Sequence, residues 1–570
     1  MVHKTFTQNH LVTILVAVLI LSGCQFSASI NGSHSDDVPV FIPPTIIPPE
    51  TPSATDVEFS FPILSWLNPQ LPEHAVNQLM SAEQLEFTDN EKEALVKFQH
   101  DSGHQIGSWI YLAVSPFHSF RRDISEADLL SLWQGEQTSS MNDTSLYLSG
   151  ETLTSISTIL GKPSGDQIII IESGEFSEDI WSNPSSLAIL PFEELSLDWK
   201  VLPVDGIDPL SVNFNIDNFL LAVPIFIDTG DIPTDIFQFD QLVTNYDPSK
   251  LSSVAMTGVT ALVRGTATIM EEKGITYPAG DIKDTLASAS ITHISNEVPF
   301  TEECPSPDPN QESLYFCSKD SYIELLEEVG ADIIELSGDH FSDQGPKSIL
   351  HTIDLYSDRD WKYYGGGEKL QAGLNAVFLE HNGNSFAFIG CNGKLHEKYA
   401  MASDTIPGAS RCDYDWMSSE IMRLDRAGYI VIATLQHEEV DSFYSIAIQQ
   451  QDFRRLGESG ATIVSGSQSH HPQAFEYTGS SFIHYGLGNL FFDQWYLATY
   501  NPSSHSNKDK SFIDIHYFYN DTHINTRLVS LQFIDLAKPR LMTDQENELL
   551  LREIFPHSSW RGQPIFIQDR

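Results

Sequence analysis

The chain has 570 residues, with 31 Lys and Arg against 78 Asp and Glu, which gives a formal net charge of −47. Such an acidic surface repels polyanions, so it argues against nucleic-acid binding, and an anionic ligand would need fixed cations or a metal ion to be held. An apolar content of 41% is sufficient for hydrophobic cores, and the length predicts more than one domain.

The first residues have the pattern of an export signal. The apolar run from Leu11 to Leu21 is too short for an ordinary membrane span and has the length of a signal-peptide core. It ends in Leu21-Ser22-Gly23-Cys24, which resembles the lipobox of bacterial lipoproteins. The resemblance implies a signal peptide over residues 1–23 and a lipid on Cys24 that holds the protein on a bacterial membrane, outside the cytosol. A plain secretory signal with a chance cysteine, or an uncleaved anchor, is the alternative.

Composition and motif order divide the remainder of the chain. Residues 24–57 are rich in Ser, Thr and Pro and predict an extended tether. We predict a first domain over residues 58–247, a second over 251–535, and a C-terminal tail over 536–570.

The first domain has the alternating elements of an α/β lobe. Trp109 to Ser115 is a candidate strand, and Ile124 to Trp133 has the apolar spacing of a capped helix that ends before Gly135. With the later apolar runs 187–192 and 201–206, this order resembles the phosphate-type periplasmic solute-binding fold. The resemblance is loose and assigns no ligand residue.

Three segments of the second domain repeat the order helix, glycine, buried strand, histidine. The amphipathic segments 321–329, 417–426 and 449–458 each end at a glycine and are followed by the apolar runs 331–336, 429–435 and 461–465. Histidines follow these runs: His340, His437, and the pair His470-His471. Because chemistry in open α/β sheets collects at the carboxyl ends of the strands, we expect these endings to converge on one site.

Five cysteines fit an extracytoplasmic protein. With Cys24 lipidated, four remain, and these permit three disulfide connectivities. We favour Cys304 with Cys317 and Cys391 with Cys412, because each pairing closes a short loop. A zinc site is the rival interpretation, but the sequence contains no C-x-x-C pair.

Six blocks of the second domain occur in an order that resembles the CapA family, the capsule-synthesis proteins associated with poly-γ-glutamate. The blocks are Thr257-Gly258-Val259, Ser295-Asn296-Glu297-Val298-Pro299, Gly338-Asp339-His340 with Asp343-Gln344-Gly345, Gln436-His437-Glu438-Glu439, Ser469-His470-His471-Pro472-Gln473, and Tyr485-Gly486-Leu487-Gly488-Asn489-Leu490-Phe491-Phe492-Asp493. The resemblance implies a layered α/β sandwich similar to that of the metallo-dependent phosphatases. The solute-binding-like lobe would be an additional N-terminal α/β domain.

The chain departs from the family pattern at three positions. Val259 stands where the family has aspartate, and Gln473 stands where it has the second histidine of His-Pro-His. Asp339 replaces an asparagine, which exchanges one oxygen donor for another. A valine cannot ligate a cation, so the family's two-metal arrangement is not expected here.

The remaining donors are suited to one divalent ion, zinc or manganese. The candidate ligands are Glu297, His340, His437, His470 and His471. His437 with Glu439 forms a candidate general-base pair, and Asp339 is a further catalytic candidate. Asn296, Gln473 and Asn489 are candidates for substrate binding. The alternative is that the histidines only hydrogen-bond to one another and to the loops, and that no metal is bound.

The resemblance implies a cell-surface protein involved in the synthesis, export or anchoring of a capsule or exopolymer. Its partners would be the membrane, through the lipid, and an envelope polymer or the machinery that makes it. Two hypotheses stay open: a binding protein that kept the pocket and lost the chemistry, or a metal-dependent hydrolase acting on a phosphoester or amide of an envelope polymer.

Overall fold

The computed structural model describes residues 62–136, 141, 144–232, 237, 243–396, 398, 400–494 and 507–565, all within one compact unit that spans residues 60–570. The predicted signal peptide, Cys24 and the tether lie outside the described residues. None of the helices in the described part of the chain is both long and apolar enough to cross a membrane.

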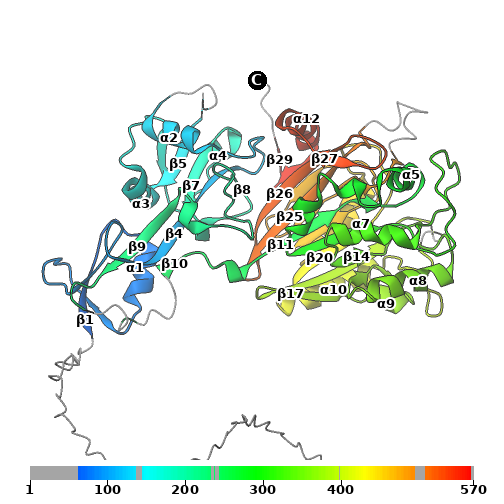
Figure 1. The fold of residues 1–570 in the computed structure, drawn as a ribbon, viewed down its shortest axis with the longest axis horizontal. Helices are drawn as coiled ribbons and strands as arrows, with labels where there is room; N and C mark the ends of the chain where they lie inside the picture. Colours follow the sequence, from blue (N-terminus) through cyan, green and yellow to red (C-terminus); the bar gives the residue numbers. More distant parts are fainter. Residues whose placement is uncertain are drawn as a thin grey trace, which may run out of the picture. The chain divides into compact units, whose positions relative to one another are not determined.

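The first sheet is built from residues 63–244 in the order β2-β1-β3-β9-β4-β7-β5-β6, with β8 and β10 also paired to β4 (Figure 1). Its strands are β1 (Ile63–Leu67), β2 (Leu85–Phe87), β3 (Val96–Gln99), β4 (His104–Pro116), β5 (Leu146–Ser149), β6 (Ile168–Ile171), β7 (Leu187–Pro191), β8 (Trp199–Val201), β9 (Ala222–Asp228) and β10 (Val243–Thr244). Its helices are α1 (Glu73–Met80), α2 (Glu126–Gln134), α3 (Gly150–Leu160) and α4 (Glu178–Ser182).

The predicted strand from Trp109 lies within β4, and the predicted capped helix is α2. The hydroxyl of Ser125 accepts a hydrogen bond from the backbone N–H of Asp128, which satisfies a free donor of the first turn. Gly135 ends the helix at φ 71°, a conformation that glycine adopts without steric cost.

Two further sheets, of nine and eight strands, are built from residues 251–564. One has the order β15-β14-β13-β11-β25-β26-β27, with β12 and β24 attached, and the other has the order β17-β18-β20-β21-β23-β22-β28-β29. The strands of the first are β11 (Leu251–Thr257), β12 (Val259–Thr260), β13 (Ile291–Asn296), β14 (Ile333–Glu335), β15 (Lys362–Tyr364), β24 (Asn489–Phe491), β25 (Lys510–Tyr519), β26 (Thr522–Phe533) and β27 (Pro539–Leu541). The strands of the second are β17 (Val377–His381), β18 (Asn384–Asn392), β20 (Ile430–Gln436), β21 (Ile463–Gly466), β22 (Phe475–Tyr477), β23 (Phe482–His484), β28 (Ser559–Trp560) and β29 (Gln563–Pro564), and β16 (Gly366–Gly367) pairs with β19 (Gly408–Ala409) apart from both.

Alternation along the strands stacks these two sheets face to face. On β18, Phe386 and Phe388 pack in one cluster with Val254 and Met256 of β11, while Ala387 and Ile389 pack in another cluster with α10 (Tyr414–Arg426) and α11 (Ala447–Glu458). Successive side chains of a strand point to opposite faces, so one face meets the other sheet and the opposite face is covered by helices.

Helices also cover the outer face of the other sheet. Leu325 of α7 (Ile323–Glu328) and Ile349 of α8 (Pro346–Ser357) pack in one cluster with Ile294 and Ile334 of β13 and β14. The remaining helices of this region are α5 (Arg264–Lys273), α6 (Lys283–Ala287), α9 (Leu370–Leu374) and α12 (Asp544–Ile554). The arrangement of helices, sheet, sheet and helices confirms the expected layered α/β fold.

The three predicted helix-glycine-strand segments are α7 to β14, α10 to β20, and α11 to β21, with positive φ at Gly330, Gly428 and Gly460. They do not belong to one sheet, because β14 lies in one of the two facing sheets and β20 and β21 lie in the other. The predicted tail is structured: it contains β27, α12, β28 and β29, and β28 extends the second sheet through its pairing with β22.

Candidate functional site

A cavity of about 310 Å³ lies where strand ends from the two facing sheets meet. Glu297 follows β13, Asp339 and His340 follow β14, Glu439 follows β20, and His470 follows β21. Its charged and titratable lining residues are Glu297, Asp339, Asp343 and Glu439 on the acidic side, and Arg264, His340, Lys394, Lys398 and His470 on the basic side. The convergence expected from the sequence is therefore present for these strand endings.

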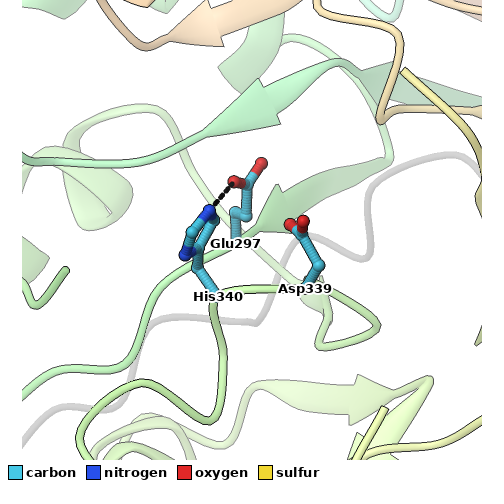
Figure 2. Close-up of side chains that lie close together, drawn as sticks. All are labelled: Glu297, Asp339 and His340. Atoms are coloured by element: carbon cyan, nitrogen blue, oxygen red, sulfur yellow. Dashed lines mark ion pairs between the residues drawn. The ribbon is translucent and has the colours of Figure 1, made fainter. Parts of the chain in front are cut away.

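Glu297, Asp339 and His340 form the centre of this group, with one ligand atom from each lying within 4.8 Å of the others. Figure 2 shows the three side chains directed toward the same space, with the His340 ring beside the Glu297 carboxylate. The distance from His340 Nε2 to Glu297 Oε1 is 4.0 Å. A Cβ on Gly338 would lie 2.6 Å from the Glu297 backbone, so only glycine allows the two strand ends to approach this closely.

Two carboxylate oxygens of this centre are buried without a hydrogen-bond partner among the described residues: Glu297 Oε2 and Asp339 Oδ1. The other oxygen of Asp339 accepts a 2.5 Å hydrogen bond from Lys394 Nζ. Buried polar atoms are normally paired, so unpaired acceptors that face a cavity indicate a missing cation or donor. The two carboxylates therefore fit a single divalent ion or a ligand group that carries hydrogen-bond donors, whereas an anionic group would have to be held by the basic lining residues.

Burial and neighbouring charges shift the titration of these groups. Burial, with the nearby Asp339 carboxylate, raises the pKa of Glu297 to about 8. Burial opposes the charged form of His340, but the 2.8 Å hydrogen bond to Asp343 and the carboxylates of Glu297 and Asp339 raise its pKa to about 9. Burial would raise the pKa of Asp339, but the Lys394 ammonium holds it below its ordinary value.

His470 contributes a neutral imidazole to the cavity. Its Nδ1 lies 2.8 Å from Asn489 Oδ1, and its Nε2 lies 3.8 Å from Glu297 Oε2. Burial lowers the pKa of His470 to about 4. Its backbone has φ 51°, a costly conformation for a residue with a side chain, and such outliers gather at functional sites.

Glu439 is held as a carboxylate at the cavity wall. Lys508 Nζ and Gln494 Nε2 each donate a 2.7 Å hydrogen bond to its Oε1. Burial would raise the pKa of Glu439, but His470 and the Lys508 ammonium lower it to about 2. A carboxylate with so low a pKa is a poor proton acceptor near neutral pH, so it is better suited to orienting a ligand than to acting as a general base.

Five predicted site residues do not line the cavity. Asn489 is one of them, and its Oδ1 lies 2.8 Å from His470 Nδ1. His437 Nε2 lies 3.0 Å from Asp452 Oδ2 on α11, and His471 Nδ1 lies 2.7 Å from the Pro472 carbonyl oxygen. Gln473 donates to the carbonyls of residues 442 and 444 and accepts from Gln449. The amide nitrogen of Asn296 donates to the Val298 carbonyl oxygen at 2.7 Å and to the Tyr356 hydroxyl at 2.8 Å. Each of these side chains makes at least one polar contact within the protein, and His437 Nδ1 and Asn296 Oδ1 are buried without a hydrogen-bond partner among the described residues.

Val259 takes part in packing. It is fully buried in a small apolar cluster with Ala261, Val263, Val298, Phe316 and Phe492. Its strand β12 pairs with β13 on one side and β24 on the other, which brings the blocks around Glu297 and Asn489 together. Position 259 thus aligns the strand ends without supplying a ligand.

Sequence reasoning missed four cations: Arg264, Lys394 and Lys398, which line the cavity, and Lys508, which pairs with Glu439. Arg264 follows the buried run 259–263, and Lys394 follows the end of β18. The side chain of Lys508 is only 1% exposed, between Glu439 and Asp441. A basic residue directly after an apolar run was the available signal for Arg264, whereas Asn392 and Gly393 separate Lys394 from the apolar part of β18.

The two predicted disulfides, Cys304–Cys317 and Cys391–Cys412, are formed. Cys391 lies in β18, so the second bridge fixes the loop that carries Lys394. The backbone N–H of Lys394 also donates to Asn392 Oδ1 at 3.1 Å. This cation is therefore presented by a restrained loop.

The two helix-covered sheets, with carboxylates and imidazoles at their strand ends, define an α/β sandwich with a polar site between strand ends. Residues 253–494 match the family model described as bacterial capsule synthesis protein PGA_cap. The resemblance to the CapA family is thereby confirmed for these residues.

Two curated relatives also match this chain. The capsule biosynthesis protein CapA of Bacillus anthracis is 24% identical over 278 residues, which cover 48% of this chain and 65% of the relative. The PGA biosynthesis protein CapA of Bacillus subtilis is 22% identical over 202 residues, which cover 35% of this chain and 50% of the relative. The chain thus spans between half and two thirds of the length of these relatives.

Solved structures show weaker similarity. A putative 5'-nucleotidase from Staphylococcus aureus matches with a TM-score of 0.32 and 8% identity, covering 54% of this chain and 59% of that one. A phosphate transport receptor from Vibrio cholerae matches with a TM-score of 0.24 and 10% identity, covering 30% of this chain and 89% of that one. Both TM-scores are below 0.5, and neither structure bears on the ligand or activity of this chain.

Proposed function

We propose that this chain is a cell-surface protein that acts in the synthesis, export or anchoring of a capsule or exopolymer such as poly-γ-glutamate. The names of the two Bacillus relatives support the capsule role. Lipidation at Cys24, attachment to a bacterial membrane, and contact with the envelope polymer or its synthesis machinery are parts of the same proposal.

The observation that carries the proposal is the retained cavity without a two-metal ligand set. Val259 packs in an apolar cluster, His437 does not line the cavity, and the Gln473 side chain is hydrogen-bonded to other protein groups. Two-metal hydrolysis needs ligands for both ions around a shared oxygen, and these positions do not supply them. The geometry therefore supports binding of a polymer segment over two-metal catalysis.

A second candidate is a metal-dependent hydrolase acting on a phosphoester or amide of an envelope polymer. The unpaired oxygens of Glu297 and Asp339, within 4.8 Å of the His340 donor, favour it. These three residues would hold one divalent ion, and such an ion supplies a Lewis acid and acidifies a bound water.

Elemental analysis of the purified chain separates the two candidates. The binding proposal expects no stoichiometric zinc or manganese in the parent. The hydrolase candidate expects about one ion per chain, lost in His340→Ala. The matched control is His351→Ala, because His351 pairs with Asp320 on the surface and does not line the cavity. A metal-free parent rules out the hydrolase.

The capsule role is tested in the source cells. Deletion of the gene is expected to reduce polymer retained on the cell surface, and the parent chain is expected to restore it. Restoration by a Cys24→Ser variant equal to that by the parent would contradict the lipid anchor. Unchanged surface polymer after deletion would contradict the capsule role itself.

A further inference from the structure

The geometry points to a metal-independent carboxylate site in this cavity, in which the Arg264 guanidinium and the Lys394 ammonium supply the positive charge. The inference rests on the proposed binding function, and it names the chemical group that the cavity recognises and the residues that hold it.

Arg264 has donors left for a ligand. Its side chain is only 2% exposed and lines the cavity, and its Nε and Nη2 make no hydrogen bond to any described residue. Nη2 lies 3.4 Å from Asp493 Oδ1, an ion-pair distance. Nε and Nη2 lie on one edge of the guanidinium, the edge that can grip both oxygens of a carboxylate.

The orientation of Arg264 is fixed by its surroundings. The guanidinium carbon lies 5.3 Å from the centre of the Phe316 ring and 4.9 Å from that of Phe492. Arg264 also has φ 46°, at the start of α5. Aromatic rings stabilise a buried cation, and a strained backbone persists where the surrounding structure enforces it. A guanidinium held in this way loses little freedom when it binds a ligand.

Lys394 places a second cation next to Asp339, one of the three clustered candidate metal ligands. Its Nζ lies 2.5 Å from Asp339 Oδ2, and its side chain is 9% exposed. An ammonium and a divalent ion beside the same carboxylate repel each other strongly in a poorly solvated site. Lys394 therefore supplies charge where the family pattern would use metal.

The charge of the cavity differs from that of the chain. Three Lys and Arg line it against four Asp and Glu, whereas the whole chain has 31 against 78. The charges in the cavity are thus nearly balanced, so an anion approaching a protein of net charge −47 is repelled less there than over the rest of the surface. The volume of about 310 Å³ is at the lower end for ligand sites and suits a short segment that ends in a carboxylate.

The test is calorimetric titration of the full chain with glutarate and with poly-γ-glutamate, each with EDTA present. The parent is expected to bind both ligands with EDTA. Lys394→Gln and Arg264→Gln are each expected to weaken glutarate binding by about tenfold or more. Lys394→Arg keeps the charge and is expected to stay within a few fold of the parent. The matched control is Lys347→Gln, which removes one exposed cation outside the cavity.

Circular dichroism checks that each variant is folded. If Arg264→Gln does not fold, the comparison of Lys394→Gln with Lys394→Arg still decides the question. Loss of binding on adding EDTA, with recovery in zinc or manganese, would overturn the inference. Equal weakening by Lys347→Gln, or inorganic phosphate binding as tightly as glutarate, would overturn it too.

Failure of the inference and failure of the proposed function give different results. Undiminished polymer binding by Lys394→Gln would contradict the inferred carboxylate site but not the proposed polymer binding. Binding of glutarate but not of the polymer supports the carboxylate site and contradicts the polymer. A parent that binds neither ligand contradicts both.

Discussion

Val259 and Lys394 together change what the strand ends can do. The first puts an apolar side chain where the family pattern has a ligand, and the second puts an ammonium 2.5 Å from Asp339. Glu297 and Asp339 are two buried carboxyl groups in one site. The neighbouring cations His340 and Lys394 do not offset the effects of burial and of Asp339 on Glu297. At the scale of single residues, the consequence is an unusual protonation of Glu297.

We predict that Glu297 makes the protein less stable as the pH rises. Burial, with Asp339, raises its folded-state pKa from the ordinary 4.5 to about 8. The folded state thus keeps a proton that the unfolded chain releases, so this contribution is complete below about pH 4.5 and is lost as the pH rises through 8. Glu297→Gln should reduce the fall of the unfolding free energy over this pH range by up to about 1.4 kcal/mol per pH unit.

Urea unfolding at pH 5 and pH 8, with EDTA present, measures the difference. The parent should lose more unfolding free energy between these two pH values than Glu297→Gln does. Parallel profiles would show that Glu297 titrates normally in the folded chain.

Among the elements, β18 and the loop after it connect the fold to the cavity. Phe386 and Phe388 pack between the sheets, Ala387 and Ile389 pack under the helices, and Cys391 anchors the loop to Cys412. The other disulfide, Cys304–Cys317, ties a loop whose residues are mostly exposed. The two bridges therefore have different structural roles.

We predict that removing the Cys391–Cys412 bridge costs more stability than removing Cys304–Cys317. The sequence separations are 21 and 13 residues, for which loop closure alone gives about 3 kcal/mol each and a difference of a few tenths. Cys391 is also only 1% exposed in the helix-covered core. A serine at this position buries a hydroxyl group there, which adds about 1 kcal/mol to the loss of unfolding free energy. Urea unfolding of the two double Cys→Ser variants compares them, and equal losses would contradict the prediction.

At the scale of the whole molecule, one apolar cluster contains residues from the first sheet's region and from the C-terminal end of the described chain. Phe117 at the end of β4 stacks on Trp560 of β28 with ring centres 4.3 Å apart, and the Trp560 indole N–H donates to Asp198 at 2.8 Å. The carbonyl of Met542 accepts from Arg122 at 2.7 Å. The C-terminal segment therefore shares a core with the first sheet's region.

We predict that Trp560→Ala destabilises the molecule by about 3–5 kcal/mol, because it removes a large buried ring and leaves Asp198 without this donor. Trp361→Ala, at a half-buried position, should cost only about 1 kcal/mol. Differential scanning calorimetry measures both. Two separate transitions of which Trp560→Ala shifts only one would show that the cluster does not couple the two regions.

The sequence predicted the elements of the fold well where local signals are strong. Helix, glycine and buried strand recur three times because apolar periodicity and glycine stops are local properties. The sequence did not reveal that β14 belongs to a different sheet from β20 and β21, because strand pairing depends on distant partners. The sequence also predicted both His470 and His471 as ligands, because it does not show that the two adjacent imidazole rings have different surroundings.

The sequence by itself determined the order of the blocks, the cysteine pairing favoured by short loops, and the absence of a carboxylate at position 259. Only the tertiary structure decided which side chains share the cavity. Glu297, Asp339, His340, Glu439 and His470 line it, and His437, His471 and Gln473 do not. The physical reason is that side-chain direction depends on strand register and local φ, and that the cations Arg264 and Lys394 reach the site only through the packing of distant segments.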